Sequence, residues 1–124
     1  MKKILIVDDN ESIRNILNIS LNNNCNLSII EATSGPDAVE IALKEAPDLI
    51  FMDIMMPGNY DGIQATKIIK QNIKTKDIKV ILLTALGQKI DIENGFKSGA
   101  DGYFVKPFSP SELVGKVDEL LGNN

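Results

Sequence analysis

The sequence predicts an α/β protein with three layers, in which a parallel five-stranded sheet lies between helices. Two observations carry this prediction: five short apolar runs occur along the 124 residues, and each is followed by a segment with the apolar spacing of a helix. Runs rich in Ile, Val and Leu without polar alternation are typical of strands buried on both faces of a parallel sheet. Such strand–helix repeats join by right-handed crossovers, and a chain of this length fits one domain.

The elements alternate strictly along the chain. The expected strands occupy residues 4–7, 27–30, 49–52, 80–83 and 103–105, and the second of these runs is the weakest. The expected helices occupy residues 10–22, 35–45, 62–71, 88–98 and 110–121. In the first helix the apolar stripe consists of Ile13, Ile16, Leu17 and Leu21.

Several helices carry sequence signals for their ends. Ser34 precedes a proline and an acid in the first turn, which is typical of an N-cap. Ser109 precedes Pro110 and has an acid three residues later, the pattern of a capping box. Asp61 is expected to open the third helix. The fourth and fifth helices are expected to end at Gly99 and Gly122.

The composition excludes several classes of function. The net charge of −4 argues against nucleic acid as a partner of this domain, because phosphate binding needs a basic face. No apolar stretch is long enough for membrane insertion, and the first apolar run is too short for a signal peptide, so we expect a cytoplasmic protein. The absence of histidine removes imidazole catalysis and imidazole metal ligation.

Polar side chains follow four of the five apolar runs. Asp8 and Asp9 follow the first run, Asp53 the third, Thr84 the fourth and Lys106 the fifth. Ligands of open α/β sheets bind at the carboxyl ends of the strands. We therefore expect these five side chains to meet in one cleft.

Such a cluster suits phosphoryl transfer. Three close carboxylates repel one another and need a cation to stay ionised together, and oxygen ligands without His or Cys favour Mg²⁺. A carboxylate can also act as a nucleophile and form an aspartyl phosphate. A Lys ammonium and a Thr hydroxyl can bind the phosphoryl oxygens. Metal, nucleophile, cation and donor are the parts that this chemistry needs.

Five short motifs identify a resemblance that covers essentially all of residues 1–124. They are Ile6-Val7-Asp8-Asp9, Met52-Asp53-Ile54-Met55-Met56-Pro57, Asp61-Gly62, Leu83-Thr84-Ala85 and Lys106-Pro107-Phe108. In this order and spacing, the chain resembles a CheY-like receiver domain of a two-component response regulator. The resemblance implies a flavodoxin-like (βα)5 fold with the strand order 2-1-3-4-5, which the family is known for.

The same resemblance implies a role for each matched residue. Asp53 would be the phosphoacceptor, and Thr84 and Lys106 would contact the phosphoryl oxygens. Mg²⁺ would be held by Asp8, Asp9, Asp53 and the backbone carbonyl of Met55. Tyr103 matches the switch aromatic, whose ring turns inward when Thr84 moves. The bond between Lys106 and Pro107 is often cis in this family.

The implied function is a phosphorylation-activated signalling switch rather than an enzyme, although the cleft would assist its own phosphorylation and dephosphorylation. A sensor histidine kinase or a phosphotransfer protein would supply the phosphoryl group. A downstream protein target would contact the face formed by the fourth helix, fifth strand and fifth helix. The chain ends three residues after Leu121, so no effector domain is expected within it. Both a complete single-domain protein and a piece of a longer chain remain open, as do a monomer and a phosphorylation-dependent dimer.

Two local features set expectations about this site. The loop of Gly58, Asn59 and Tyr60 is one residue longer than is usual in the family, which could alter partner fit or access for the phosphoryl donor. Met55 and Leu86 lie two residues after Asp53 and Thr84, and both are apolar. Neither can orient a water molecule for hydrolysis, so we expect slow self-dephosphorylation.

Three alternatives belong to other classes. The first is a Mg²⁺-dependent phosphohydrolase that forms an aspartyl phosphate, but such enzymes usually carry a second acid two residues after the nucleophile, where Met55 stands. The second is a nucleotide or flavin binder, but the chain has no glycine-rich phosphate loop. The third is an interaction module that is never phosphorylated, which the complete set of five groups disfavours.

Overall fold

The five strands form one parallel sheet in the order β2-β1-β3-β4-β5, so the expected order is confirmed. The computed structural model describes residues 2–22, 27–56, 60–85 and 89–122, with side chains from residue 92 in the last range. The strands are β1 (Lys2–Val7), β2 (Leu27–Ala32), β3 (Leu49–Asp53), β4 (Lys79–Thr84) and β5 (Gly102–Val105). The helices are α1 (Glu11–Leu21), α2 (Gly35–Glu45), α3 (Gly62–Gln71), α4 (Lys89–Lys97) and α5 (Pro110–Leu121).

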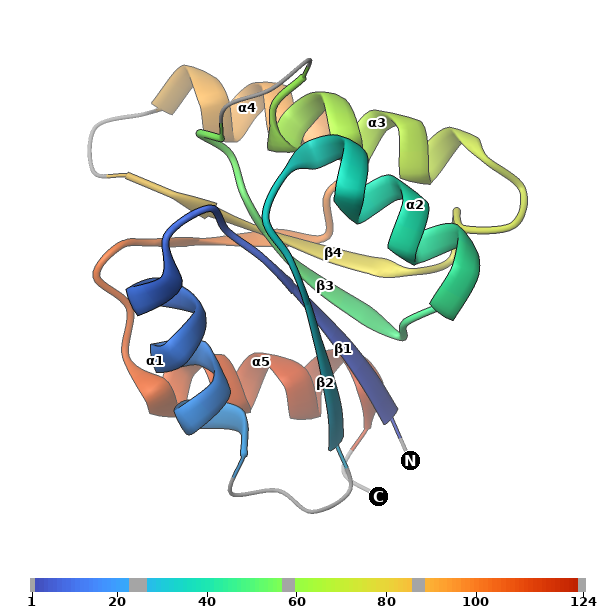
Figure 1. The fold of residues 1–124 in the computed structure, drawn as a ribbon. Helices are drawn as coiled ribbons and strands as arrows, with labels where there is room; N and C mark the ends of the chain where they lie inside the picture. The colour runs from blue at the N-terminus through green and yellow to red at the C-terminus, as the bar shows by residue number, and fades with distance from the viewer. Residues whose placement is uncertain (1, 23–26, 57–59, 86–88, 123–124) are drawn as a thin grey trace.

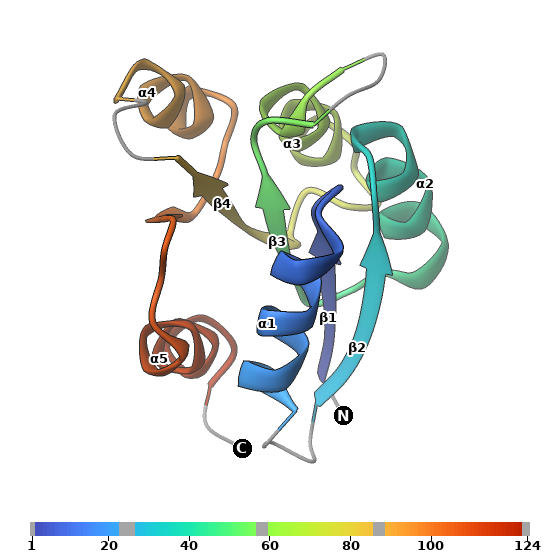
Figure 2. The ribbon, with the colours of Figure 1, turned by 60° about the vertical axis from the view of Figure 1, so that its left-hand side comes forward.

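Helices cover both faces of the sheet, as the three-layer prediction requires. Figure 1 shows α2, α3 and α4 above the sheet and α1 and α5 below it, and Figure 2 shows the same division from another side. Alternate residues of the strands feed two separate cores. Leu5, Ile50 and Leu82 lie in the core under α2 and α3, whereas Ile6 and Phe51 lie in the core with α1 and α5.

The central strands are more deeply buried than the edge strands. Every residue of β3 is buried, and so are the last four residues of β1 and the last five of β4. Strand β2 is mostly half-buried, and β5 has only one fully buried residue, because each of these strands has a neighbour on one side only. The expectation of burial on both faces is therefore confirmed for the inner strands and too strong for the two edges.

The helix ends follow the sequence signals. Ser34 and Ser109 accept hydrogen bonds from the backbone N–H groups of Asp37 and Glu112. Asp61 forms a full capping box with Gln64 at the start of α3. Gly122 caps α5 through its backbone N–H. The expected start of the fourth helix at Gln88 lies outside the described residues, and none of the described helices is long and apolar enough to cross a membrane.

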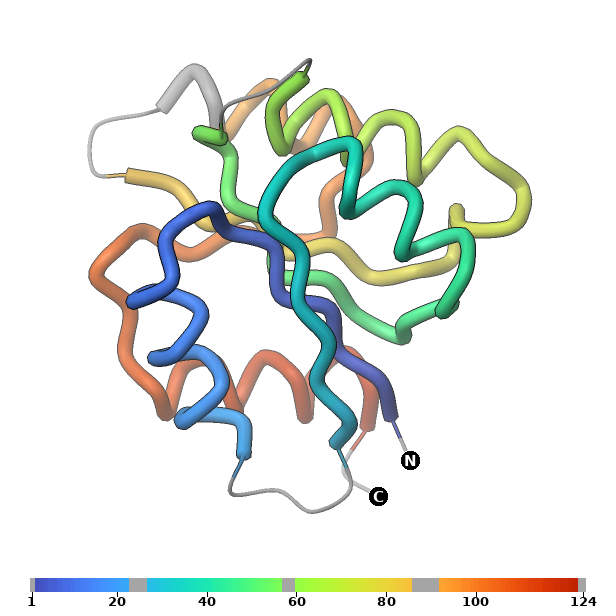
Figure 3. Tube along the Cα trace, in the orientation of Figure 1, coloured from blue at the N-terminus to red at the C-terminus, as the bar shows by residue number. Residues whose placement is uncertain are grey.

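The fold brings the carboxyl ends of the strands to one edge of the sheet. All the neighbouring strand pairs are parallel, so each strand ends at the same edge. The Cα trace in Figure 3 shows β1, β3 and β4 ending on the same side of the molecule. The residues expected to carry the chemistry follow these ends, which places them near one another.

Candidate functional site

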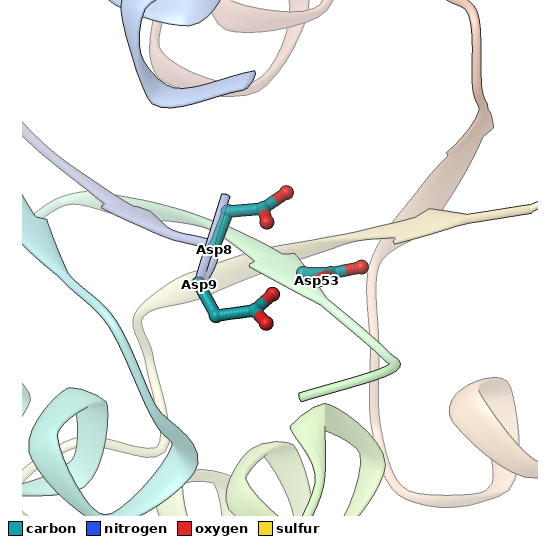
Figure 4. Close-up of side chains that lie close together, drawn as sticks. All are labelled: Asp8, Asp9 and Asp53. Carbon is teal, nitrogen blue, oxygen red and sulfur yellow. The ribbon is translucent and has the colours of Figure 1, made fainter. Parts of the chain in front are cut away.

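Three carboxylates converge at the carboxyl edge of the sheet. Asp8 and Asp9 follow β1, and Asp53 is the last residue of β3. Each offers an oxygen, and these oxygens all lie within 4.8 Å of one another. Figure 4 shows the three side chains extending into the same space. The register explains the convergence, because Val7 pairs with Met52 and the next residues are Asp8 and Asp53.

Lys106 joins two of the three carboxylates. Its Nζ lies 3.1 Å from Asp8 Oδ2 and 3.1 Å from Asp53 Oδ1. The residue follows β5, and its backbone N–H donates to the carbonyl of Thr84 at 2.8 Å. The bond between Lys106 and Pro107 is cis, as the resemblance implies. The expected meeting of Asp8, Asp9, Asp53 and Lys106 is thus present in the structure.

The acidic groups of the cluster outnumber its basic group, and the pKa values of Asp53 and Lys106 are both shifted. The pKa of Asp53 is raised to about 6: burial is the largest cause, the nearby Asp8 carboxylate adds to it, and Lys106 opposes both. Burial alone would lower the pKa of Lys106, but the Asp53 and Asp8 carboxylates raise it above its ordinary value. Lys106 pairs with Asp8 and Asp53, and Asp9 lies close to both acids, so these four side chains carry excess negative charge when ionised.

The donor set fits Mg²⁺. Asp8 and Asp53 are buried and Asp9 is exposed, so the three oxygens form a site that is anchored on one side and open on the other. A hard divalent cation with oxygen ligands and several waters matches such a site, and its charge would offset the repulsion. Met55 lies at the rim with its side chain 62% exposed, and its backbone carbonyl remains a predicted ligand.

Two residues that sequence reasoning did not assign hold the β1–α1 loop. Arg14 donates from Nη1 to the carbonyl oxygen of Asp8 at 2.8 Å and from Nε to Glu31 at 2.9 Å. The backbone N–H of Asn10 donates to Asp8 Oδ1 at 2.9 Å, and the Asn10 side chain caps α1. A basic residue one turn into the helix after two acids is a signal that could have indicated the role of Arg14.

Gly62 is required by close packing. A Cβ at this position would overlap the backbone carbonyl oxygen of Asp53. The N–H of Gly62 donates to the carbonyl of Ile54 at 3.0 Å, which ties the start of α3 to the chain just after Asp53. The sequence showed Asp61-Gly62 as a motif, but only the structure gives the reason for the glycine.

The other residues expected at the site lie on β4, on β5 and in the longer loop. Thr84 is buried at the end of β4, one residue beyond the Leu83 that pairs with Asp53. The ring of Tyr103 is directed elsewhere: it contacts Phe96 of α4 and is 41% exposed. In the longer loop, Tyr60 packs against Gly35 at the start of α2. Pro57, Gly58, Asn59 and Leu86 lie outside the described residues.

Comparisons with known proteins identify the family to which this chain belongs. The model of the response regulator receiver domain family matches residues 4–118. The chain is 43% identical over 119 residues to the transcriptional regulatory protein ResD of Bacillus subtilis (strain 168), covering 96% of this chain and 48% of that protein. It spans about half the length of the curated relatives it matches.

Solved structures give the same result. The chemotaxis protein CheY4 of Vibrio cholerae has a TM-score of 0.87 and 29% identity, with 97% of this chain and 98% of that chain covered. The receiver domain of DrrB, solved in a BeF3-activated form, has a TM-score of 0.86 and 31% identity, with 99% of each chain covered.

Proposed function

Because this chain belongs to the response regulator receiver family, whose domains serve signalling, we propose that it is a switch phosphorylated on Asp53. The observation that carries the proposal is the position of Asp53, whose carboxylate lies next to those of Asp8 and Asp9 and contacts Lys106 at the carboxyl ends of the strands. Residues 1–124 would form one receiver domain, working in the cytoplasm. The donor would be a sensor histidine kinase or a phosphotransfer protein.

The side chains of the cluster divide the work of the transfer. A carboxylate oxygen of Asp53 would attack the phosphorus, the bond from phosphorus to the donor would break, and an acyl phosphate would form. Lys106 already lies within hydrogen-bond distance of Asp53 and would move its contact to a phosphoryl oxygen. The Thr84 hydroxyl would donate a hydrogen bond to a second phosphoryl oxygen. Mg²⁺ held by Asp8, Asp9, Asp53 and the Met55 carbonyl would supply positive charge next to the incoming group.

The output would be a change in protein contact. A new dianion next to Thr84 and Lys106 acts on the connections that follow β4 and β5, which lead into α4 and α5. The face of α4, β5 and α5 would then bind a downstream protein target. This face carries two exposed aromatic side chains, Phe96 and Tyr103. The signalling role is supported by the family.

Intact-mass spectrometry after treatment with acetyl phosphate and Mg²⁺ tests the proposal. We expect wild type to gain one phosphoryl mass in a Mg²⁺-dependent manner and Asp53→Asn to gain none. Lys106→Met should slow uptake on the order of 10²-fold, because a positioned cation is lost from the transition state. Lys116→Met is the matched control, since its lysine pairs with Glu119 on α5.

Three results would count against the proposal. Uptake that persists in Asp53→Asn would place the phosphoryl group elsewhere. No uptake by wild type from acetyl phosphate or from a phosphorylated phosphotransfer protein would favour the interaction module. Continued turnover of a small phosphoester would instead favour the aspartyl-phosphate phosphohydrolase. Met55 stands at the position, two residues after the nucleophile, where that chemistry expects a second acid.

A further inference from the structure

An aromatic pair joins α4 to the edge strand β5. The ring centroids of Phe96 and Tyr103 lie 5.9 Å apart and the ring planes meet at 83°, an edge-to-face arrangement. Phe96 is 47% exposed and Tyr103 is 41% exposed, so both rings remain at the surface. Such pairs have a preferred geometry and contribute beyond the burial of area. Phe96 therefore favours the outward orientation of the Tyr103 ring.

The neighbouring glycine explains why Phe96 reaches this position. A Cβ on Gly95 would overlap the Cδ1 atom of Leu82 in β4. A glycine inside a helix is unfavourable on its own and usually has a packing reason, which here is the close approach of α4 to the sheet. Leu82 pairs in register with Tyr103. The residue after Gly95 is thus held next to the Tyr103 ring.

We propose that Phe96 is a positioning residue that holds Tyr103 outward and thereby opposes activation of the receiver. The inference rests on the proposed function and on the switch role that the family resemblance implies for Tyr103, whose ring would turn inward when Thr84 binds the phosphoryl group. That turn must break the contact with Phe96. The pair therefore lowers the fraction of unphosphorylated protein that is already in the active arrangement.

Linkage gives the size of the effect. When only a minor arrangement binds a ligand well, the apparent affinity is proportional to the population of that arrangement. An aromatic pair of this kind changes such a population by about two- to tenfold. Removing the Phe96 ring should therefore tighten the binding of a phosphoryl mimic by the same factor. A residue that served only the stability of α4 would leave this affinity unchanged.

Beryllofluoride with Mg²⁺ is the probe, and ¹⁹F NMR of protein labelled with 3-fluorotyrosine is the readout. The chain has only two tyrosines, so the spectrum has two resonances and Tyr60→Phe assigns them. We expect Phe96→Ala to shift the Tyr103 resonance of the free protein and to lower the beryllofluoride midpoint about two- to tenfold. Phe96→Leu keeps the apolar bulk without the ring and should act in the same direction.

Two controls complete the design. Phe96→Tyr keeps the ring and should keep the wild-type midpoint; this variant adds a third fluorotyrosine, so its titration is followed at the Tyr103 resonance. Leu43→Ala removes an equally exposed apolar side chain from α2 and should change nothing. An unchanged or higher midpoint in Phe96→Ala, with wild type responding normally, overturns the inference and leaves the proposed function intact. Wild type that binds no beryllofluoride and accepts no phosphoryl group contradicts the proposed function and this inference with it.

Discussion

The amino ends and the carboxyl ends of the strands, called here the amino edge and the carboxyl edge of the sheet, differ in how their charged side chains are paired. At the amino edge, Lys70 Nζ donates to Asp101 Oδ2 at 2.9 Å and to the carbonyl of Ile78 at 2.6 Å, and the same Asp101 oxygen accepts the N–H of Val80. One acid meets one base there, and the backbone supplies the remaining partners. At the carboxyl edge, Lys106 is shared by Asp8 and Asp53, with Asp9 close by. The first edge is arranged for stability, whereas the second keeps excess negative charge ready for a cation.

The largest expected effect is on the free energy of unfolding, which should change in opposite directions when the charge of Asp53 and the charge of Asp101 are removed. Asp53→Asn should raise the free energy of unfolding of the metal-free protein near neutral pH by up to about 3 kcal/mol, because an ionised carboxylate with a raised pKa destabilises the fold. Asp101→Ala should lower it by about 1–3 kcal/mol, because Val80 N–H and Lys70 lose their acceptor. Urea denaturation measures both.

Asp77→Asn is the control for this pair, since Asp77 is exposed and should change little. Added Mg²⁺ should raise the stability of wild type and so narrow its difference from Asp53→Asn. Equal destabilisation by Asp53→Asn and Asp101→Ala would show that the two edges do not differ in the way described.

The pH dependence sharpens the same comparison. The pKa of Asp53 is raised from 3.8 to about 6 in the folded protein, so between these values the folded protein binds more protons at Asp53 than the unfolded chain does. The contribution of Asp53 to the free energy of unfolding therefore falls as pH rises from about 4 to about 6 and stays low above that range. Asp53→Asn lacks this fall.

Urea denaturation in metal-free buffers across this range gives the measurement. The advantage of Asp53→Asn over wild type should grow as pH rises, since the titration of the other carboxylates is common to both proteins. A difference that is the same at every pH would contradict the raised pKa.

The smallest expected effect concerns apolar residues at the carboxyl edge. Met55→Asn combined with Leu86→Glu should shorten the phosphoryl lifetime several-fold, because polar side chains at these positions could orient the attacking water. Met55 is 62% exposed at the rim, and Leu86 lies outside the described residues. Intact mass followed over time after removal of the donor measures the lifetime. An unchanged or longer lifetime would contradict the prediction that the apolar residues at these two positions slow hydrolysis.

Most of the fold follows from local patterns. The strand runs and helix stripes predict all ten elements to within about two residues, because short apolar runs and amphipathic segments alternate without interruption. The strand order came from the family resemblance and not from these patterns. The deeper burial of β3 over β2 also depends on the order, since only the order decides which strands lie at the edges.

The contacts of the site also divide into those that the sequence predicts and those that it does not. The meeting of Asp53 with Asp8 and Lys106 could be predicted, because parallel strands end at one edge. The contact of Arg14 with the Asp8 carbonyl and the ring contact of Phe96 with Tyr103 could not. Both depend on the direction of a helical side chain after the helix has packed, which spacing along the sequence does not give.

Two glycines differ in the space around them, and this difference determines where the domain can be engineered. At Gly62 even a methyl group would meet the carbonyl oxygen of Asp53, so a library of variants has no freedom there without separating α3 from β3. At Gly115 in α5 an added Cβ meets nothing within 4 Å. A biosensor built on this domain could therefore carry a dye on a side chain at position 115, on the helix proposed to contact the target, while position 62 must be left as it is.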